Sequence, residues 1–427
     1  MKWINPDKFF DMNRPKLLMF GWEFPPHNSG GLGVACFGLS RALSRLNTEI
    51  IFVLPQKIPT TADFMRVVFP EDYLSEEIIR QSRLTGDLML HAYVTSQEYQ
   101  TQLEKVSLLK GAVTYASDLY GEVRRYGVLA RAIAKKETFD VIHAHDWLSF
   151  PAGIEAKRVS GKPLIVHVHA TEFDRCGGPD INRQVFEIEK EGLEKADGIV
   201  AISEFVKNNI IRNYGADPKK IRVIHNGVDE EDYATDPGAH EGFEALKAAG
   251  KKIVLFLGRI TIQKGPDYFI EAAKIVLNYN PDVIFLVAGS GDMERQMIRK
   301  AAELGIGDKV IFTGFLRGKE WLQVFRSADL FVMPSVSEPF GLVALESMVN
   351  GTPVLISKQS GVSEVARNVL KTDFWDTEEM ANKILAVLGS EGLPAVLKKE
   401  GFSEAREISW KEAAKKCIEF YNQLAQT

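Results

Sequence analysis

Two glutamates that stand eight residues apart lie in a stretch whose pattern suits the binding of phosphate and sugar. Glu338 stands in a turn after an apolar strand, and Glu346 lies about one turn into the helix that begins near Leu342. Backbone N–H groups at such a helix start bind anions, and Gly341 lets a phosphate approach the backbone. Carboxylates so placed accept hydrogen bonds from the hydroxyls of a sugar and a ribose. A plain strand–loop–helix with one acid favouring the helix dipole explains the same residues equally well.

Two basic residues, Arg259 and Lys264, occur in the loop directly after the apolar run 253–257. Ligands of open α/β sheets bind beyond the carboxyl ends of the strands, so this loop is placed for binding. Arginine forms forked hydrogen bonds to a diphosphate, lysine adds a point charge, and both stabilise a departing nucleotide diphosphate. Two solvated surface residues are the plainer interpretation of this loop by itself.

A glycine-rich stretch that includes Gly30 and Gly31 precedes the first predicted helix. Glycines here permit a tight turn and the close approach of a phosphate or sugar. The spacing differs from the Gly-x-Gly-x-x-Gly pattern of dinucleotide-binding folds, so the motif alone is weak.

Four histidines alternate along two predicted strands, and alternate histidines on strands are able to ligate a metal. They are His143, His145, His167 and His169. No His-Glu-x-x-His motif or cysteine cluster supplies a defined further ligand, so hydrogen-bonded structural histidines are the favoured interpretation. No Asp-x-Asp pattern suggests a metal-bound diphosphate, a role that the Arg259/Lys264 pair would fill. We therefore expect no metal and no cofactor.

The elements that must position these residues alternate between apolar runs of strand length and stretches of helical periodicity. This alternation predicts parallel sheets with helices on both faces. The predicted strands are 16–20, 49–54, 141–143, 164–169, 198–202, 222–224, 253–257, 283–288, 310–313, 330–333 and 353–356. The predicted helices include 34–46, 188–196, 266–277, 292–304 and 342–349.

The series of elements divides into two at the turn-rich stretch 225–229, and a chain of 427 residues suits two domains. We predict a first domain at 1–228 and a second at 229–408. Residues 56–125 fit the alternation poorly and are interpreted as an insertion in the first domain. Residues 409–427 are predicted to form a final amphipathic helix.

Composition narrows the class of protein and of partner. The formal net charge is −5, so no global basic field recruits nucleic acid. The three cysteines are far apart in the sequence, which favours a reducing compartment. No apolar run is long enough for a membrane span or a secretory signal, and we expect a cytoplasmic protein.

Together these stretches resemble the retaining glycosyltransferases of the GT-B type, specifically family four. The resemblance rests on SEPFGLVALE with its Glu-x7-Glu pair, and on the order and spacing of other motifs across nearly all the chain except 56–125. They are WEFPPHNSGGLG, DVIHAHDW, LIVHVHATEF, IHNGVD, GRITIQKGPDYFIEAA, VAGSGD and VIFTGF. The resemblance implies two Rossmann-like, doubly wound domains that face a cleft. It also implies that the last helix crosses back to the first, acceptor-side domain.

The resemblance assigns roles residue by residue. Arg259 and Lys264 would bind the donor diphosphate, Glu338 the donor-sugar hydroxyls and Glu346 the ribose. His169 would sit beside the donor sugar and orient the reaction. Backbone groups would meet the sugar and the phosphates at Phe340, Gly341 and Leu342 and, from the other domain, at Gly30 and Gly31.

The implied reaction moves a hexosyl group from a nucleotide-diphosphate sugar to a saccharide with retention at the anomeric carbon and without a protein nucleophile. Glucose is the first candidate sugar, with UDP- or ADP-glucose as donor. The N-terminal motifs are similar to those of glycogen and starch synthases, which suggests an α-glucan acceptor. Those enzymes usually carry a lysine before the paired glycines and a cysteine after the proline, where this chain has Asn28-Ser29 and Phe340.

Other functions stay open on the sequence. The acceptor is alternatively a small sugar or a lipid-linked saccharide, and a basic stretch at 124–136 would suit a membrane surface, although a solvated helix face is favoured. A nucleotide-sugar epimerase would not need the glutamate pair, and an α-glucan phosphorylase would need a pyridoxal lysine and a longer chain. A non-catalytic sugar-nucleotide binder is disfavoured because five candidate side chains are present together. They are Arg259, Lys264, Glu338, Glu346 and His169.

Overall fold

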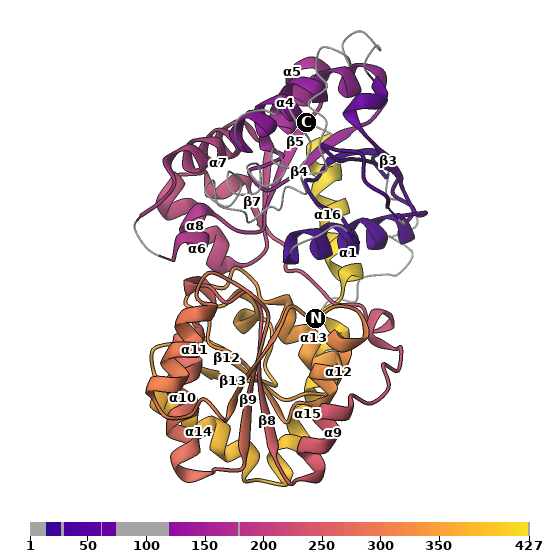
Figure 1. The fold of residues 1–427 in the computed structure, drawn as a ribbon. Coiled ribbons are helices and arrows are strands. Elements are labelled where there is room, and N and C mark those ends of the chain that lie inside the picture. The colour runs from indigo at the N-terminus through magenta and orange to yellow at the C-terminus, as the bar shows by residue number, and fades with distance from the viewer. Residues whose placement is uncertain (1–13, 27–29, 61, 74–118, 178–179, 426–427) are drawn as a thin grey trace, which may run out of the picture.

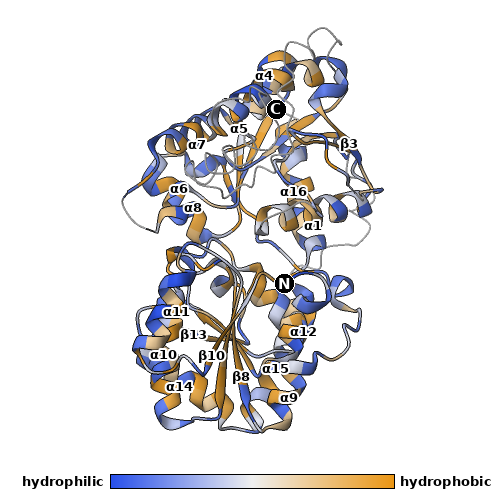
Figure 2. Ribbon diagram, in the orientation of Figure 1, coloured by the Kyte–Doolittle hydropathy of each residue, from blue (hydrophilic) through white to orange (hydrophobic). Residues whose placement is uncertain are grey.

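The computed structural model describes residues 14–26, 30–60, 62–73, 119–177 and 180–425. These residues form two parallel sheets, each with helices packed on both faces (Figure 1). Figure 2 shows apolar strands in the middle of each domain and helices that turn hydrophilic residues outward. The predicted α/β class with two doubly wound domains is confirmed.

The first sheet has seven parallel strands in the order β3-β2-β1-β4-β5-β6-β7. β1 pairs with β2 on one side and with β4 on the other, so the chain crosses the sheet between β3 and β4. The strands are β1 (Leu17–Phe20), β2 (Ile50–Val53), β3 (Arg66–Val68), β4 (Val141–His145), β5 (Leu164–Val168), β6 (Gly198–Ala201) and β7 (Ile221–Val223). The α-helices are α1 (Gly31–Arg45), α4 (Leu119–Lys136), α5 (Phe150–Ser160), α6 (Glu172–Cys176), α7 (Arg183–Lys195) and α8 (Glu204–Tyr214).

The second sheet has six parallel strands in the order β10-β9-β8-β11-β12-β13. Its strands are β8 (Lys252–Leu257), β9 (Val283–Ala288), β10 (Val310–Gly314), β11 (Leu330–Met333), β12 (Val354–Ser357) and β13 (Leu370–Thr372). Its helices are α9 (Glu241–Ala248), α10 (Pro266–Tyr279), α11 (Glu294–Glu303), α12 (Lys319–Ser327), α13 (Leu342–Val349), α14 (Thr377–Leu388) and α15 (Gly392–Glu407). The 3-10 turns among the described residues are η2 (Pro70–Tyr73), η3 (Pro218–Lys220), η4 (Glu230–Tyr233), η5 (Ile262–Lys264) and η6 (Gly361–Glu364).

The last helix, α16 (Trp410–Ala425), lies against α1 and β4 of the first domain (Figure 1). Gly38 makes room for this packing, because a Cβ there would overlap the Trp410 ring. The Tyr421 hydroxyl also meets His143 Nδ1 at 2.6 Å. The second domain is therefore tied to the first at both ends of its chain.

The described residues of the range 56–125 include the strand β3 of the first sheet and the start of α4. β3 pairs with β2 in parallel, and Tyr73 of η2 bonds to Glu137 just after α4. Residues 74–118, which make up most of the predicted insertion, lie outside the described residues.

The carboxyl ends of the two sheets face each other across the domain boundary. α6 follows β5 and touches η5, which follows β8. α8 follows β6 and touches η6, which follows β12. Since ligands of parallel sheets bind at these ends, the boundary is where a site is expected.

Direct hydrogen bonds cross this boundary. Ser337 Oγ donates to Asp174 Oδ1 over 3.0 Å, and Ser203 Oγ donates to the carbonyl of Pro339 over 2.7 Å. Glu364 of the second domain accepts the first N–H groups of α8. The domains thus meet at the loop that carries Glu338.

Candidate functional site

A tight turn places Lys264 against Glu338. Gly265 adopts φ +63° directly after Lys264 and is the N-cap residue of α10, and a Cβ there would overlap the carbonyl oxygen of Pro334. The loop after β8 therefore lies on the loop after β11. Lys264 Nζ stands 2.6 Å from Glu338 Oε2, an oxygen that also accepts from Ser335 Oγ at 3.0 Å.

This ion pair is held out of bulk water. The Glu338 side chain is 7% exposed and that of Lys264 is 22% exposed. An ammonium group beside a nearly buried carboxylate holds both side chains in place, because each compensates the desolvation of the other. The pair therefore presents a cation and hydrogen-bond acceptors at the carboxyl end of the sheet.

Arg259 lies in the same loop and donates to Gln263 Oε1 over 3.1 Å. Two glycines after β9 support this loop by backbone contact. A Cβ on Gly289 would overlap the carbonyl of Gly258, and a Cβ on Gly291 would overlap that of Ile260. The floor beside Arg259 is therefore made of backbone, which suits the close approach of a phosphate.

The start of α13 carries no side-chain cap, and its first backbone N–H groups face the same boundary. Gly341 precedes the helix with φ +103°, a conformation that favours glycine. Phe340 is buried, and its carbonyl accepts the N–H of Val362 over 2.6 Å. Leu342 is the first helical residue, so the structure places the predicted anion site at a true helix N-terminus.

Glu346 is buried inside α13 and is only half satisfied. Its Oε1 accepts from the Tyr233 hydroxyl at 3.1 Å, while Oε2 has no partner among the described residues. Burial raises the pKa of Glu346 to about 7, against the lowering effect of the Tyr233 hydrogen bond. A buried carboxylate oxygen without a donor is costly, which makes this oxygen a candidate acceptor for a ligand hydroxyl.

His169 is buried just beyond β5 and is held by two neighbours. Its Nε2 lies 3.0 Å from His145 Nδ1, and its backbone N–H donates to Asp146 Oδ1 over 2.6 Å. Its Nδ1 has no partner within the described part of the chain. Burial lowers the pKa of His169 to about 3, so the ring is neutral and offers hydrogen bonds without charge.

The four predicted histidines form one stacked array. His143 and His145 stack with ring centroids 4.4 Å apart, as do His167 and His169 at 4.2 Å. Two triads among the described residues, Cys36/His145/His169 and His143/His145/His167, place possible ligand atoms within 4.8 Å of one another. Cross-strand hydrogen bonds join the rings of His143 and His167 and those of His145 and His169, and these bonds account for the array as a neutral network.

Asp146 fixes the backbone of His169. It adopts φ +58°, in the left-handed region that Asp and Asn tolerate best, and burial raises its pKa to about 7, although Arg175 opposes this. The fold thus favours the protonated acid, and this contribution to stability is lost as pH rises through 7. We expect Asp146→Asn, which keeps the acceptor oxygen, to gain stability relative to the natural protein by about 1–3 kcal/mol between pH 5 and pH 8.

Urea unfolding of both proteins at the two pH values measures this gain. A difference in unfolding free energy that does not change with pH would contradict the raised pKa of Asp146.

Gly30 and Gly31 stand at the start of α1. Gly30 is the N-cap residue and makes no side-chain cap, and Glu23 Oε1 instead accepts the first-turn N–H of Gly33 over 3.0 Å. A Cβ on Gly31 would meet no atom of the described residues within 4 Å. The fold itself therefore does not require a glycine at position 31.

We expect Gly31→Ala to leave thermal stability unchanged or slightly raised, because alanine favours helices over glycine. If a donor phosphate approaches this backbone, the added methyl group should raise the donor KM about tenfold. Melting curves and donor titrations separate the two effects. Gly392→Ala is the control, since Gly392 also starts a helix with open space around its Cβ. An unchanged KM would remove Gly31 from the site.

The predicted site residues lie on two sides of the domain boundary. In the second domain, the predicted residues lie in the loop after β8, in the loop after β11 and in α13, which follows the latter loop. β8 and β11 are neighbouring strands, so the two loops are adjacent. His169 lies at the end of β5 in the first domain, shortly before α6. The bond from Ser337 to Asp174 of α6 brings the Glu338 loop to that side of the boundary.

The structure adds residues that the sequence did not single out. Gln263 and Ser335 orient Arg259 and Glu338, and Tyr233 bonds to Glu346. His145 was interpreted from the sequence as a structural histidine. Its alternation with His143 was the sequence signal for a histidine that contacts His169. Tyr233 carried no signal, because it meets Glu346 only through the fold.

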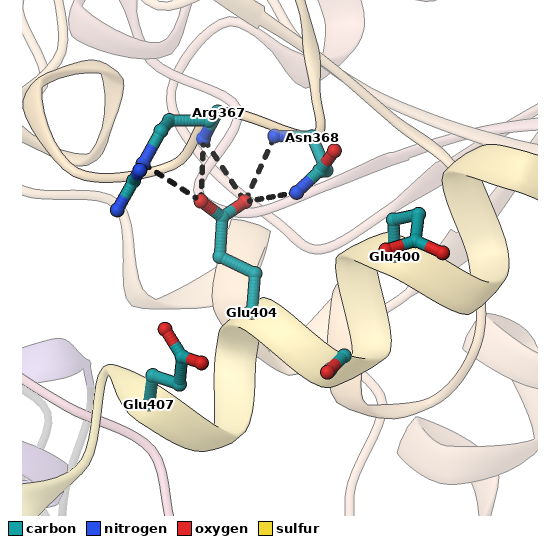
Figure 3. A pocket seen from close by; sticks show the side chains of 6 residues that line it. Arg367, Asn368, Glu400, Glu404 and Glu407 are labelled. Carbon is teal, nitrogen blue, oxygen red and sulfur yellow. Dashed lines mark hydrogen bonds and ion pairs between the residues drawn. The ribbon is translucent and has the colours of Figure 1, made fainter.

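A separate hollow of about 180 Å³ lies near the amino end of β13 and the side of α15 (Figure 3). Its centre is Glu404, which accepts the backbone N–H groups of Arg367 and Asn368. Figure 3 shows these groups paired with one another. We interpret this hollow as a structural junction, since the candidate site lies at the other ends of the strands.

The basic stretch of α4 is the part of the first domain that was considered as a membrane-binding surface. Arg125 pairs with Glu122 at 3.0 Å, and Arg131 pairs with Glu155 of α5. These acids neutralise part of the stretch, as on a solvated helix face. Among the described residues, none of the helices combines the length and the apolar character needed to cross a bilayer.

Solved structures share this arrangement of two domains. HepE from Anabaena, in a crystal structure with UDP and glucose, matches with a TM-score of 0.69 at 18% identity, over 96% of this chain and 100% of its own. Sucrose-phosphate synthase from Thermosynechococcus elongatus matches with a TM-score of 0.65 at 20% identity, over 96% and 99% of the two chains. The fold is that of the GT-B glycosyltransferases.

Sequence comparisons define the family. A model described as Glycosyltransferase Family 4 matches residues 29–232, and one described as Glycosyl transferases group 1 matches residues 240–404. An uncharacterized glycosyltransferase of Methanocaldococcus jannaschii is 28% identical over 423 residues, which are 95% of this chain and 97% of that protein. A D-inositol 3-phosphate glycosyltransferase of Salinispora tropica is 31% identical over 324 residues, or 70% and 67% of the two chains. The chain belongs to glycosyltransferase family 4, and the resemblance noted in its motifs is confirmed.

A glycogen synthase of Mycobacterium tuberculosis H37Rv is also similar. It is 27% identical over 366 residues, which cover 83% of this chain and 80% of that protein. The relatives thus include enzymes named for a polymeric product and for a small phosphorylated acceptor.

Proposed function

We propose that this glycosyltransferase moves a hexosyl group, glucosyl first among the candidates, from a nucleotide-diphosphate sugar to a saccharide acceptor with retention. The observation that carries the proposal is the Lys264–Glu338 pair at 2.6 Å, placed beside the uncapped start of α13. A cation, hydrogen-bond acceptors and free N–H groups at one point match a sugar joined to a diphosphate.

The diphosphate, the sugar and the ribose of the donor each have a matching group. Arg259 and Lys264 bind the diphosphate, and the N–H groups after Gly341 assist them. Glu338 accepts hydrogen bonds from the sugar hydroxyls, and the free oxygen of Glu346 accepts those of the ribose. HepE has been solved with UDP-glucose, which makes a uridine donor the first to test.

The transfer step needs no group from the protein to attack the sugar. The bond between the anomeric carbon and the phosphate oxygen breaks, and its electron pair stays on the diphosphate, where Arg259 and Lys264 stabilise the charge. The acceptor oxygen bonds to the same carbon from the same face, and its proton passes to the departing phosphate oxygen. Glu338 is held by Lys264 and Ser335, which suits a binder of the sugar and disfavours a nucleophile.

His169 completes the site from the first domain. Its neutral ring and unpartnered Nδ1 suit a hydrogen bond to a donor-sugar hydroxyl. The bonds from Ser337 and Ser203 across the boundary suit a closed state that keeps water from the donor. With cations from the protein at the diphosphate, we propose that transfer needs no metal and persists with a chelator.

Two acceptor classes remain as candidates because relatives of both kinds match. An α-glucan is the first, supported by the glycogen synthase of Mycobacterium tuberculosis. A small phosphorylated acceptor is the second, supported by the D-inositol 3-phosphate glycosyltransferase of Salinispora tropica.

The test incubates the protein with UDP-glucose or ADP-glucose and follows the release of nucleoside diphosphate. Glycogen, malto-oligosaccharide, inositol 3-phosphate or no acceptor is added in parallel, with the double variant Glu338→Ala, Lys264→Ala as the blank. Release that requires a glucan establishes an α-glucan synthase and identifies its donor. Slow release that is indifferent to glucan supports another acceptor. No release from either donor, with no binding of UDP or ADP, would contradict the proposed donor.

A further inference from the structure

Tyr233 lies in the segment that joins the two domains. Its side chain contacts the candidate site although this segment carries none of the predicted site residues. Its hydroxyl donates to Glu346 Oε1 over 3.1 Å. The other oxygen of Glu346 points to no donor among the described residues. The Tyr233 hydrogen bond therefore selects which carboxylate oxygen stays open.

Three arginines hold the segment that carries Tyr233. Arg326 of α12 donates to the Tyr233 carbonyl over 2.6 Å. Arg41 of α1 makes a forked pair with Asp232 at 2.6 and 2.5 Å and reaches Asp229 at 3.0 Å. Arg45, one turn further along α1, pairs with Glu231.

These contacts join three parts of the protein. α1 belongs to the first domain and begins at Gly31, α12 belongs to the second, and η4 lies between them. A forked arginine–carboxylate pair fixes direction as well as distance. The position of Tyr233 is thus set by both domains together, although its hydroxyl serves a carboxylate of the second domain only.

We propose that Tyr233 is a positioning residue for donor binding: its hydroxyl orients Glu346 so that the open oxygen accepts the ribose hydroxyls of the donor. The ion pairs of Arg41 keep the hydroxyl in place. This assignment rests on the proposed function, because it requires that Glu346 binds the ribose. Tyr233 itself touches neither the sugar nor the diphosphate.

The variant Tyr233→Phe removes one oxygen and keeps the ring. We expect it to weaken the binding of UDP or ADP about fivefold, the effect of one lost hydrogen bond. In turnover it raises the donor KM by the same factor and leaves kcat within about twofold. Tyr279→Phe, at a ring that is 76% exposed at the end of α10, is the matched control and should change neither.

Calorimetric titration with UDP and ADP and with their 2′,3′-dideoxy forms tests the assignment. Tyr233→Phe should weaken the binding of the ribonucleotide and leave the binding of the dideoxy form unchanged, since the dideoxy form has no ribose hydroxyls for Glu346. In a Glu346→Gln background, Tyr233→Phe should have little further effect. Equal weakening of both nucleotides would overturn the assignment and leave Tyr233 a structural role. If the natural protein binds neither diphosphate, the proposed donor and this assignment fail together.

Discussion

Lys264→Ala is expected to lower kcat/KM for the donor by about 10²–10³-fold, the usual effect of removing one group that stabilises developing negative charge. Two losses combine. The departing diphosphate loses a cation, and Glu338 loses the partner that stands 2.6 Å from its Oε2. Among the described residues, Ser335 is then the one donor that remains to that oxygen, so the carboxylate is less firmly fixed for the sugar hydroxyls.

The stability cost of this change should be smaller than its effect on catalysis. Breaking a fully buried ion pair costs about 3–5 kcal/mol, but Lys264 is 22% exposed and water enters its place. Steady-state kinetics with melting curves on the same samples separate the two effects.

Lys251→Ala is the matched control for Lys264→Ala. Lys251 pairs with Asp282 at 2.7 Å, its side chain is 27% exposed, and it lies just before β8, at the opposite end of the strand from Lys264. We expect its kcat/KM to stay within about twofold of the natural value. Equal losses in the two variants would mean that Lys264 acts through stability alone.

His169→Ala should lower kcat by about 10²-fold and raise the donor KM only slightly. The reason is that its hydrogen bond to the sugar strengthens as charge develops at the anomeric carbon. Because the pKa of His169 is lowered to about 3, the ring is neutral from pH 5 to pH 8. The rate ratio between the natural protein and the variant should therefore be the same at both ends of that range.

His240→Ala is the matched control for His169→Ala. Each ring stacks on a neighbouring ring at 4.2 Å, His240 on Phe243 and His169 on His167, but His240 is the N-cap of α9, a helix that carries none of the candidate site residues. A rate ratio for His169→Ala that changes steeply near pH 6.5 would contradict a neutral ring. Equal activity of the two variants would remove His169 from the mechanism.

Most of the strands that the sequence predicted are apolar runs in the interior of each sheet, and the edge strands β7 and β10 were predicted as well, as 222–224 and 310–313. The runs 283–288 and 330–333 agree with the structure residue for residue, because strands buried on both faces read as continuous apolar stretches. β3 and β13 were missed. Each is a three-residue edge strand, and Arg66 and Lys371 interrupt any apolar pattern.

The candidate site was predictable where its residues share a loop. Arg259 and Lys264 follow one strand, and Glu338 and Glu346 bracket one helix start, so local spacing carried the signal. The support around them was not predictable. Tyr233 and Glu346 are 113 positions apart, and Ser337 and Asp174 are 163 apart, so only the fold brings them together.

One NMR time course with a nucleotide-activated glucose and its accepted saccharide tests the central claim most directly. Phosphorus signals follow the nucleotide, and anomeric proton signals follow the sugar. The account predicts that nucleoside diphosphate appears as fast as a new α-linked glucosyl unit on the acceptor, and that Lys264→Ala slows both together. A β-linked product, or nucleoside monophosphate with glucose phosphate, would contradict retaining transfer at this site.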